Sequence, residues 1–201
     1  YLNRNSNVMQ GDVRFVDYNA DGVIDQNDQV AYEGTQYPLY NFGLSLRAEY
    51  KGFSIDGLLQ GMLDKRSYFN GIAADPFYNS YNRIYAYQMN DYWAVDNPDA
   101  FYPAIHYNAA LKSGNNDLSY AQRYLNTTFV RLKELQIAYT ARPNWERFPV
   151  DYFMVYVSGN NLLTFSKFNE LGDPEKTRFS SGADNSYPLI RRYNIGVKLN
   201  F

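Results

Sequence analysis

The chain of 201 residues contains no cysteine and only one histidine, His106. It therefore has no disulfide framework and no thiolate or multi-histidine metal site. No segment approaches the roughly 18 consecutive apolar residues of a transmembrane helix. The 19 Lys and Arg nearly balance the 21 Asp and Glu and are interspersed with them, which argues against a nucleic-acid partner. The sequence also has no Gly-rich phosphate loop and no nucleophile elbow.

Aromatic residues, in contrast, are abundant: they make up 18% of the chain, and 21 residues are Tyr. The mean hydropathy is nevertheless -0.53, so the apolar side chains are not gathered into long runs. This combination suits a membrane β-barrel, which carries its apolar residues in alternation and places Tyr at the membrane interfaces. A Tyr-rich soluble β-sandwich has the same composition.

The last nine residues alternate between apolar and polar side chains. Successive side chains of a strand point to opposite faces, so the segment has one apolar face and one polar face. A soluble edge strand alternates in the same way, but ending on such a strand with Phe is typical of outer-membrane barrels. In a barrel the lumen would receive Arg192, Asn194 and Lys198, and lipid would contact Tyr193, Ile195, Val197, Leu199 and Phe201.

Five segments have the composition and alternation of antiparallel strands. We expect them at 37–50, 53–63, 125–140, 150–160 and 187–201, with a shorter run at 12–16 that is either a strand or part of a loop. The first two form a hairpin around Lys51-Gly52. In the third, the apolar residues change from even to odd positions at Lys133 and Glu134. An extra residue switches faces without ending a strand, so we predict a β-bulge there.

Short connections alternate with long ones along the chain. Loops of about 60 residues (64–124) and about 26 residues (161–186) are improbable inside a compact domain. Short turns on one side and long loops on the other are the outer-membrane pattern, in which the long loops face the cell exterior. A short helix is expected across 82–93. The loops either pack on themselves or contact a glycan, peptide or protein partner, through aromatic side chains such as Tyr92, Trp93, Tyr102 and Phe168.

The most specific chemical motif is the twelve-residue segment 17–28, DYNADGVIDQND. It matches a calcium-binding loop, in which oxygen ligands at alternate positions surround a hard cation and Gly22 permits the sharp turn. Asp28 replaces the usual Glu and indicates modest affinity. An ordinary Asp/Asn/Gly turn is the alternative. The expected ligands of a structural Ca²⁺ are Asp17, Asn19, Asp21, the Val23 carbonyl, Asp25 and Asp28.

Other candidate motifs are weak. His106 lies between Ile105 and Tyr107, and we expect it to pack within a loop. The glycosylation pattern of Asn126 spans only three residues and opens a predicted strand. Acidic pairs such as Asp96 and Asp99 show no matched acid and base. The sequence therefore predicts no enzyme.

Taken in order, several segments resemble the C-terminal part of a SusC/RagA-type TonB-dependent outer-membrane transporter. They are GDVRFVDYNADGVIDQND, YNFGLSLRAEYKGFSIDGLLQG, YWAVDNPDAFYP, FVRLKELQIAYT, VYVSGNNLLTFSKF with GDPE, and SYPLIRRYNIGVKLNF. The resemblance implies the C-terminal strands of an antiparallel transmembrane barrel of about 22 strands with a plugged lumen. It also implies import of glycans or peptides across the outer membrane of a Gram-negative, Bacteroidota-type bacterium.

The same resemblance implies two protein partners. One is a SusD-like surface lipoprotein that covers the extracellular side, and the other is TonB, which supplies energy from the periplasm. The plug and the TonB-contacting segment belong to the N-terminal part of such proteins, which this sequence does not contain. Two other functions stay open: a secreted calcium-binding β domain that adheres to carbohydrate, and an outer-membrane enzyme with its site in the large loop.

Overall fold

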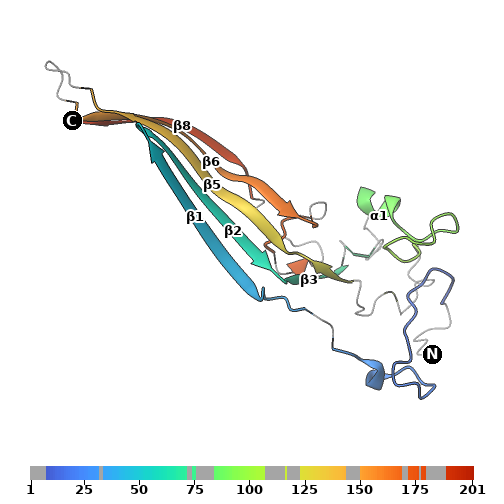
Figure 1. The fold of residues 1–201 in the computed structure, drawn as a ribbon. Helices are drawn as coiled ribbons and strands as arrows, with labels where there is room; N and C mark the ends of the chain where they lie inside the picture. The colour runs from blue at the N-terminus through green and yellow to red at the C-terminus, as the bar shows by residue number, and fades with distance from the viewer. Residues whose placement is uncertain are drawn as a thin grey trace. The chain divides into compact units, whose positions relative to one another are not determined.

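A computed structural model describes residues 8–31, 34–71, 74–75, 84–106, 116, 123–143, 150–168, 172–176, 178–179 and 189–201. The chain divides into two compact units. One contains residues 1–36, 66–125 and 176–185, and the other contains residues 37–65, 126–175 and 186–201. Strands predominate, and the helices of the described part are a 3-10 turn, η1 (Gln26–Asp28), and a single short helix, α1 (Ala86–Asn90) (Figure 1). None of the helices in these ranges has the length and apolarity to cross a membrane.

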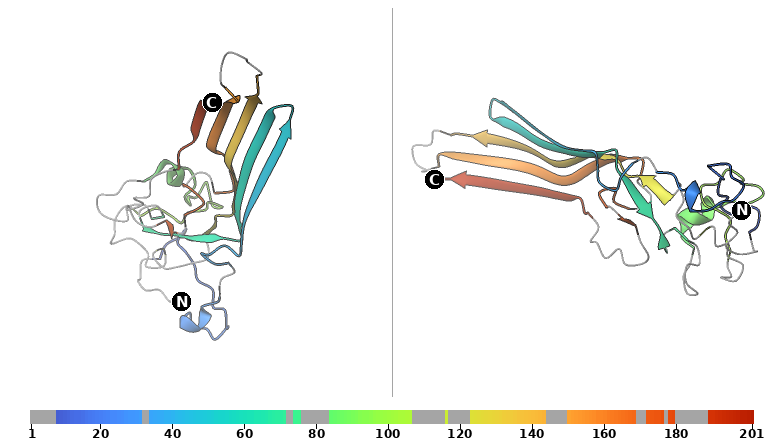
Figure 2. Two further views of the ribbon diagram at one scale, coloured as in Figure 1. Left: turned by 90° about the vertical axis from the view of Figure 1, so that its left-hand side faces the viewer. Right: turned by 90° about the horizontal axis from the view of Figure 1, so that it is seen from below.

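The second unit is built on one five-stranded sheet. Its strands are β1 (Tyr40–Tyr50), β2 (Phe53–Leu63), β5 (Phe129–Ala141), β6 (Tyr152–Ser166) and β8 (Arg192–Asn200). They lie in the order β1-β2-β5-β6-β8, and each pairs antiparallel with its neighbour. Figures 1 and 2 show them as one continuous twisted sheet. The all-β, antiparallel character predicted from the sequence is confirmed.

A two-residue turn joins β1 to β2. Lys51 and Gly52 both have positive φ, at 47° and 86°, as a type I′ hairpin turn requires. The Gly52 carbonyl accepts a hydrogen bond from the Thr140 amide of β5 at 2.8 Å. A Cβ at Gly52 would lie 2.6 Å from the Thr140 carbonyl oxygen, so this position needs glycine both for its φ and for the close approach of β5.

The β-bulge predicted in β5 is confirmed. Leu58 and Leu59 of β2 pair with Glu134 and Leu132, which leaves Lys133 without a partner residue in β2. The pairing of β5 with β6 shifts at the same place. The extra residue reverses the parity of β5. Apolar side chains at even positions before the bulge and at odd positions after it therefore lie on the same face of the sheet.

Other boundaries differ from the sequence prediction. β6 extends to Ser166 and not to residue 160, because Asn161 adopts a φ of 53° and lets the strand continue past the Asn-Asn pair. The expected strand at 125–140 is divided into β4 (Tyr124–Asn126) and β5. The side chain of Asn126 accepts a hydrogen bond from the Thr128 amide at 2.9 Å, a local turn that interrupts the ladder.

The segment 12–16 contains no strand, since the Val13 amide donates to the side chain of Asn116 at 2.8 Å and not to a neighbouring strand. The helix expected at 82–93 is the shorter α1. The last strand begins at Arg192, and residues 181–188 lie outside the described part.

The first unit contains a small sheet of three strands, in the order β4-β3-β7. β3 (Arg66–Phe69) pairs in parallel with β7 (Arg178–Phe179). The rings of Tyr68 and Tyr124 lie 5.0 Å apart across the β3 and β4 strands. This unit holds the calcium-like loop and, from residue 66 on, the described part of the 64–124 loop.

Candidate functional site

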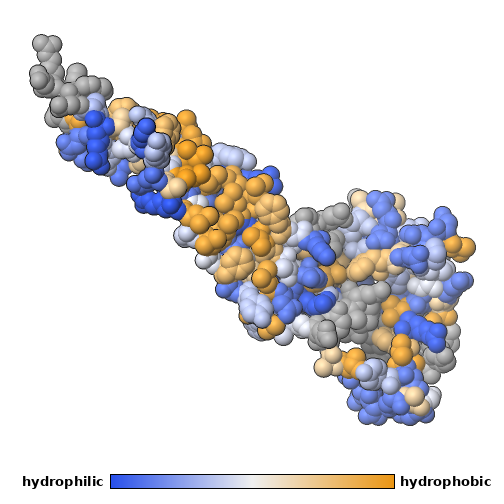
Figure 3. Space-filling model, in the orientation of Figure 1, coloured by the Kyte–Doolittle hydropathy of each residue, from blue (hydrophilic) through white to orange (hydrophobic). Residues whose placement is uncertain are grey.

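The five-stranded sheet has one face on which the described strands carry no charged side chain. The strand registers bring these positions together across all five strands. Apolar residues gather over the middle of the sheet in Figure 3. The positions are Tyr40, Phe42, Leu44, Leu46, Ala48 and Tyr50; Phe53, Ile55, Gly57, Leu59, Gly61 and Leu63; Val130, Leu132, Leu135, Ile137, Tyr139 and Ala141; Phe153, Val155, Val157, Gly159, Leu163 and Phe165; and Tyr193, Ile195, Val197 and Leu199.

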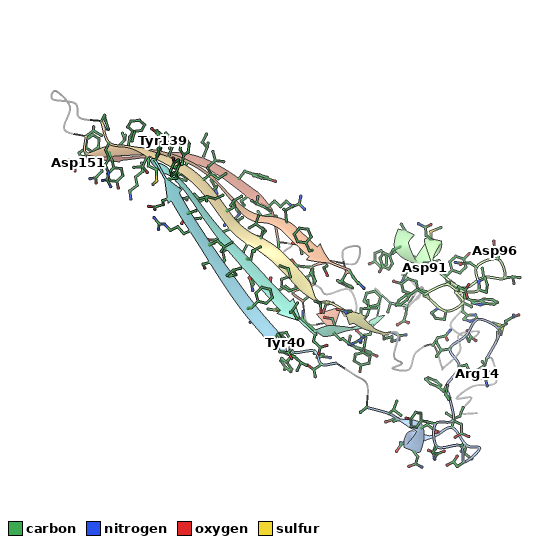
Figure 4. The ribbon with its side chains drawn as sticks, viewed as in Figure 1. Arg14, Tyr40, Asp91, Asp96, Tyr139 and Asp151 are labelled. Atoms are coloured by element: carbon green, nitrogen blue, oxygen red, sulfur yellow. The ribbon has the colours of Figure 1, made fainter. Side chains whose placement is uncertain are left out.

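Aromatic residues lie at the two ends of this apolar face, and aliphatic residues lie between them. Tyr40 is at the loop end and Tyr139 is at the hairpin-turn end (Figure 4). Phe53 packs against Tyr139 with ring centroids 4.7 Å apart. The aliphatic middle is exposed, with Leu46 at 57% and Ile195 at 79% of their maximal accessibility. A band of exposed aliphatic residues between two aromatic girdles is the lipid-facing pattern of outer-membrane barrels.

The height of the band also suits a bilayer. Ten residue steps separate Tyr40 from Tyr50 in β1. At about 3.3 Å per residue the distance along the strand is about 33 Å, which projects to about 23 Å at a tilt of about 45°. The apolar band of outer-membrane barrels is about 25 Å tall.

The opposite face is mostly polar, with ion pairs near the hairpin turn. Arg47 forms an ion pair with Glu49 and approaches Asp56 at 3.5 Å. Tyr156 lies over Gly196 of the neighbouring strand, where a Cβ would meet the ring at 2.5 Å. The polar positions include Asn41, Ser45, Ser54, Gln60, Arg131, Glu134, Gln136, Thr140, Ser158, Asn160, Thr164, Arg192, Asn194, Lys198 and Asn200.

The fold is similar to a segment of the RagAB transporter. Three solved chains are described as the RagAB peptide transporter and as the RagAB peptide importer in its 'open-open' and 'closed-closed' states. The chain is 23%, 25% and 23% identical to them, with TM-scores of 0.62, 0.58 and 0.61 over 90%, 82% and 90% of its length. It covers only 20%, 17% and 20% of those chains. No protein-family model and no curated protein sequence matches it.

The calcium-like loop is closed by hydrogen bonds from its own backbone amides. Asp17 accepts from the amides of Asp21 at 3.2 Å and Gly22 at 2.8 Å, and Asp28 accepts from those of Tyr18 at 2.7 Å and Asp25 at 2.7 Å. The amide of Asp25, together with those of Tyr18 and Asn19, holds the pKa of the Asp28 carboxyl below its ordinary value. The backbone thus brings the first and last carboxylates of the motif into one loop.

The geometry of this loop permits the turn that a cation site needs. Gly22 has a φ of 85° and Ala20 a φ of 59°, while Ile24 is buried beneath the loop. In the described ranges, no three His, Cys, Asp or Glu side chains are grouped closely enough to hold a metal. The predicted ligands Asp17, Asn19, Asp21, Val23, Asp25 and Asp28 therefore share the loop, with the carboxylates directed at amides.

Three of the four predicted contact aromatics lie in one cluster. Tyr92 and Tyr102 pair as a β-bridge, and the Trp93 amide donates to the Tyr102 carbonyl at 2.8 Å. Trp93 covers Gly11, where a Cβ would lie 2.2 Å from the indole ring. Tyr102 is only 7% exposed. Its side chain is therefore largely packed within this unit.

Phe168, the fourth predicted contact residue, belongs to the sheet unit and is 6% exposed. Its side chain is also largely buried within its own unit. The described 84–106 segment does expose apolar side chains, but they belong to residues that the sequence analysis did not single out. They are Tyr85, Met89, Val95 and Phe101.

The prediction that His106 packs within a loop is confirmed. Its Nε2 lies 2.7 Å from a carboxylate oxygen of Asp12, which also accepts from the Asn116 side chain at 2.8 Å. The Asn116 carbonyl in turn accepts from Arg123, which forms a buried bidentate ion pair with Asp75. This network joins four distant parts of the first unit.

The glycosylation pattern at 126–128 begins at the last residue of β4. Asn126 is exposed, and its side chain contacts the amide of Thr128, the residue whose hydroxyl the pattern requires, while Thr127 at the unrestricted middle position is fully buried.

Sequence reasoning also missed a buried lysine. Lys65 is 1% exposed, and its Nζ donates to the carbonyls of Pro174 at 2.7 Å and Glu175 at 2.9 Å. Burial lowers the pKa of Lys65 to about 8, and the nearby carboxylates of Glu175 and Asp173 oppose that shift.

The docked arrangement of residues 172–175 should become more stable between pH 8 and pH 10. In this window Lys65 is neutral when buried, with a pKa of about 8, but charged when released, with an ordinary pKa of 10.5. The docked state therefore binds fewer protons, and its stability rises with pH. Amide exchange of Glu175 and Lys176, corrected for the intrinsic effect of pH, measures the change. Lys65→Met should abolish this pH dependence, and an equal dependence in that variant would contradict the assignment.

Proposed function

We propose that the chain is the C-terminal part of a SusC/RagA-type TonB-dependent transporter in the outer membrane of a Gram-negative, Bacteroidota-type bacterium. The observation that carries the proposal is the apolar sheet face with aliphatic residues between aromatic ends. Such a face is costly in water but suited to lipid. The similarity in fold to a segment of RagAB transporter chains supports the same assignment.

In this proposal the five strands form part of the wall of a barrel of about 22 strands. The apolar face contacts lipid, and the polar face, including Arg192, Asn194 and Lys198, lines the lumen. The Lys51-Gly52 turn lies on the periplasmic side, and the loops 64–124 and 167–186 lie outside the cell. The protein imports glycans or peptides, with a SusD-like lipoprotein over the loops and TonB bound to a segment beyond this sequence.

The test uses the full-length protein that contains this chain. Expressed with a signal for the outer membrane, it should be extracted only by detergent and should migrate faster in gel electrophoresis before heating than after it. Cells should take up fluorescent peptides or oligosaccharides only when TonB is present. Release into plain buffer as a folded, calcium-dependent carbohydrate binder would instead support the secreted adhesion domain.

We also propose that the 17–28 loop binds a structural Ca²⁺. Some of the hydrogen bonds from amides to Asp17, Asp21 and Asp28 would be exchanged for contacts with the ion. Carboxylate, amide and carbonyl oxygens in this number favour Ca²⁺ over Mg²⁺.

Asp21→Ala should weaken Ca²⁺ binding at least about tenfold and leave the sheet folded, because it removes one charged ligand from a loop that otherwise closes on amides. Isothermal titration calorimetry of the full-length protein with Ca²⁺, with Mg²⁺ in parallel, measures the loss. Asp96→Ala, an exposed carboxylate outside the motif, is the matched control. Absence of binding at millimolar Ca²⁺ in the unaltered protein would refute the site.

A further inference from the structure

The segment 172–175, named here the strap, is held in place mainly by two buried cations. Besides the two carbonyls that accept from Lys65, its carboxylates meet Arg131 of β5. Arg131 donates to Asp173 at 2.7 Å and to Glu175 at 2.8 Å. The Arg131 side chain is 3% exposed. The strap is thus bound through its backbone by one cation and through its side chains by the other.

Arg131 is itself fixed by the sheet. Its Nε donates to the Thr164 hydroxyl of β6 at 3.0 Å, and its guanidinium lies 5.0 Å from the ring centroid of Phe129, which is 1% exposed. Because β5 and β6 position this guanidinium, it forms a rigid fork that matches carboxylates on two residues.

The strap is also preorganised for this contact. Asp173 accepts a hydrogen bond from the Glu175 amide at 2.9 Å, so the carboxylate that binds Arg131 also shapes the strap backbone. Gly172 has a φ of 138°, which turns the chain into the strap. Pro174 is buried, and it is the one apolar residue that the strap contributes.

The charge of Arg131 therefore contributes to docking of the strap, because a buried cation that loses its carboxylate partners is strongly unfavourable. Lys65 contributes instead through the hydrogen bonds from its Nζ to the two carbonyls, which a neutral amine also donates. The sheet beneath depends on different interactions, since β5 and β6 are joined by a ladder of backbone pairs. Loss of the strap contacts can thus occur without loss of the sheet.

We propose that Lys65 and Arg131 form a latch that fixes the strap beside the ends of β2 and β5. The placement of the strap outside the cell rests on the proposed function, but the latch itself does not. The latch is a conformational device: docked, it orders residues 172–175, and released, it frees these residues while the sheet persists.

Hydrogen exchange of the purified full-length protein in detergent tests the latch. The double variant Asp173→Asn with Glu175→Gln keeps the shape of both side chains and removes their charges. Exchange of the peptide containing Glu175 and Lys176 should accelerate at least about tenfold, while peptides from β5 and β6 stay within about twofold of the parent. Glu49→Gln, which removes an exposed carboxylate of the sheet, should alter neither region.

Unchanged exchange at Glu175 and Lys176 would overturn the latch. Equal acceleration of β5 and β6 would overturn it too, because the charges would then stabilise the sheet as a whole. If the double variant does not assemble, Lys65→Met provides the same comparison, since it leaves both pairs of Arg131 intact and should still accelerate exchange of the strap alone. None of these readouts requires transport, so the latch and the proposed function can fail separately.

Discussion

An arginine at Ile195 should prevent most of the protein from assembling in the membrane, whereas an arginine at the adjacent Asn194 should be tolerated. Ile195 lies in the middle of β8 on the apolar face, opposite Val157 of β6. A basic residue on the lipid face costs about 2–4 kcal/mol near the midplane, which is roughly a 30- to 1000-fold change in the folding equilibrium constant. Asn194 has the opposite parity and would place its charge on the polar face.

The measurement is the fraction of protein that migrates as the folded, heat-modifiable form in gels of outer-membrane extracts. Asn194→Arg is a matched control, since it introduces the same side chain one residue away on the same strand. Full assembly of Ile195→Arg, or equal loss in both variants, would show that the apolar face does not contact lipid.

Deletion of residues 70–120 should strongly weaken co-purification of the proposed SusD-like lipoprotein and leave barrel assembly intact. This segment carries the exposed apolar side chains Tyr85, Met89 and Val95, at 46%, 59% and 86% accessibility. Aromatic residues and Met are enriched at protein interfaces, and a few such residues dominate the binding energy. The five-stranded sheet makes its own ladder and needs none of the deleted residues.

A finer version replaces Tyr85, Met89 and Val95 by Ser and keeps the loop length. Affinity for the lipoprotein should fall at least about tenfold, because three exposed apolar contacts are lost together. Arg14→Ser, a substitution elsewhere in the same unit, serves as the control. If the lipoprotein stays at full stoichiometry while cargo binding disappears, the loop captures substrate instead.

The sheet could be predicted from the sequence because its signal is local. Alternation over neighbouring residues defines a face, and the change of parity at Lys133 indicated the bulge before any partner strand was known. The continuation of β6 past residue 160 was not predicted, because the prediction again used only the local composition. The pair Asn160-Asn161 has the composition of a turn, yet Asn161 takes a positive φ inside the strand.

The contacts of the loops could not be predicted, because they join residues far apart in the sequence. Asp12 and His106 are separated by 94 positions, and Lys65 and Glu175 by 110. No periodicity links such pairs. Composition indicated that the aromatic residues mattered, but not that Tyr102 and Phe168 are core while Tyr85 and Met89 are exposed.

The bulge in β5 also has an evolutionary consequence. A single-residue deletion elsewhere in this strand moves every side chain beyond it to the opposite face of the sheet. Charged side chains then lie on the apolar face, and apolar side chains lie on the polar face. At Lys133 or Glu134 a deletion restores simple alternation, and the pairing of Leu58 and Leu59 with β5 becomes continuous. Among related proteins, changes in the length of this strand should therefore be concentrated at this one point, where insertion and loss of a residue are both compatible with an unchanged wall.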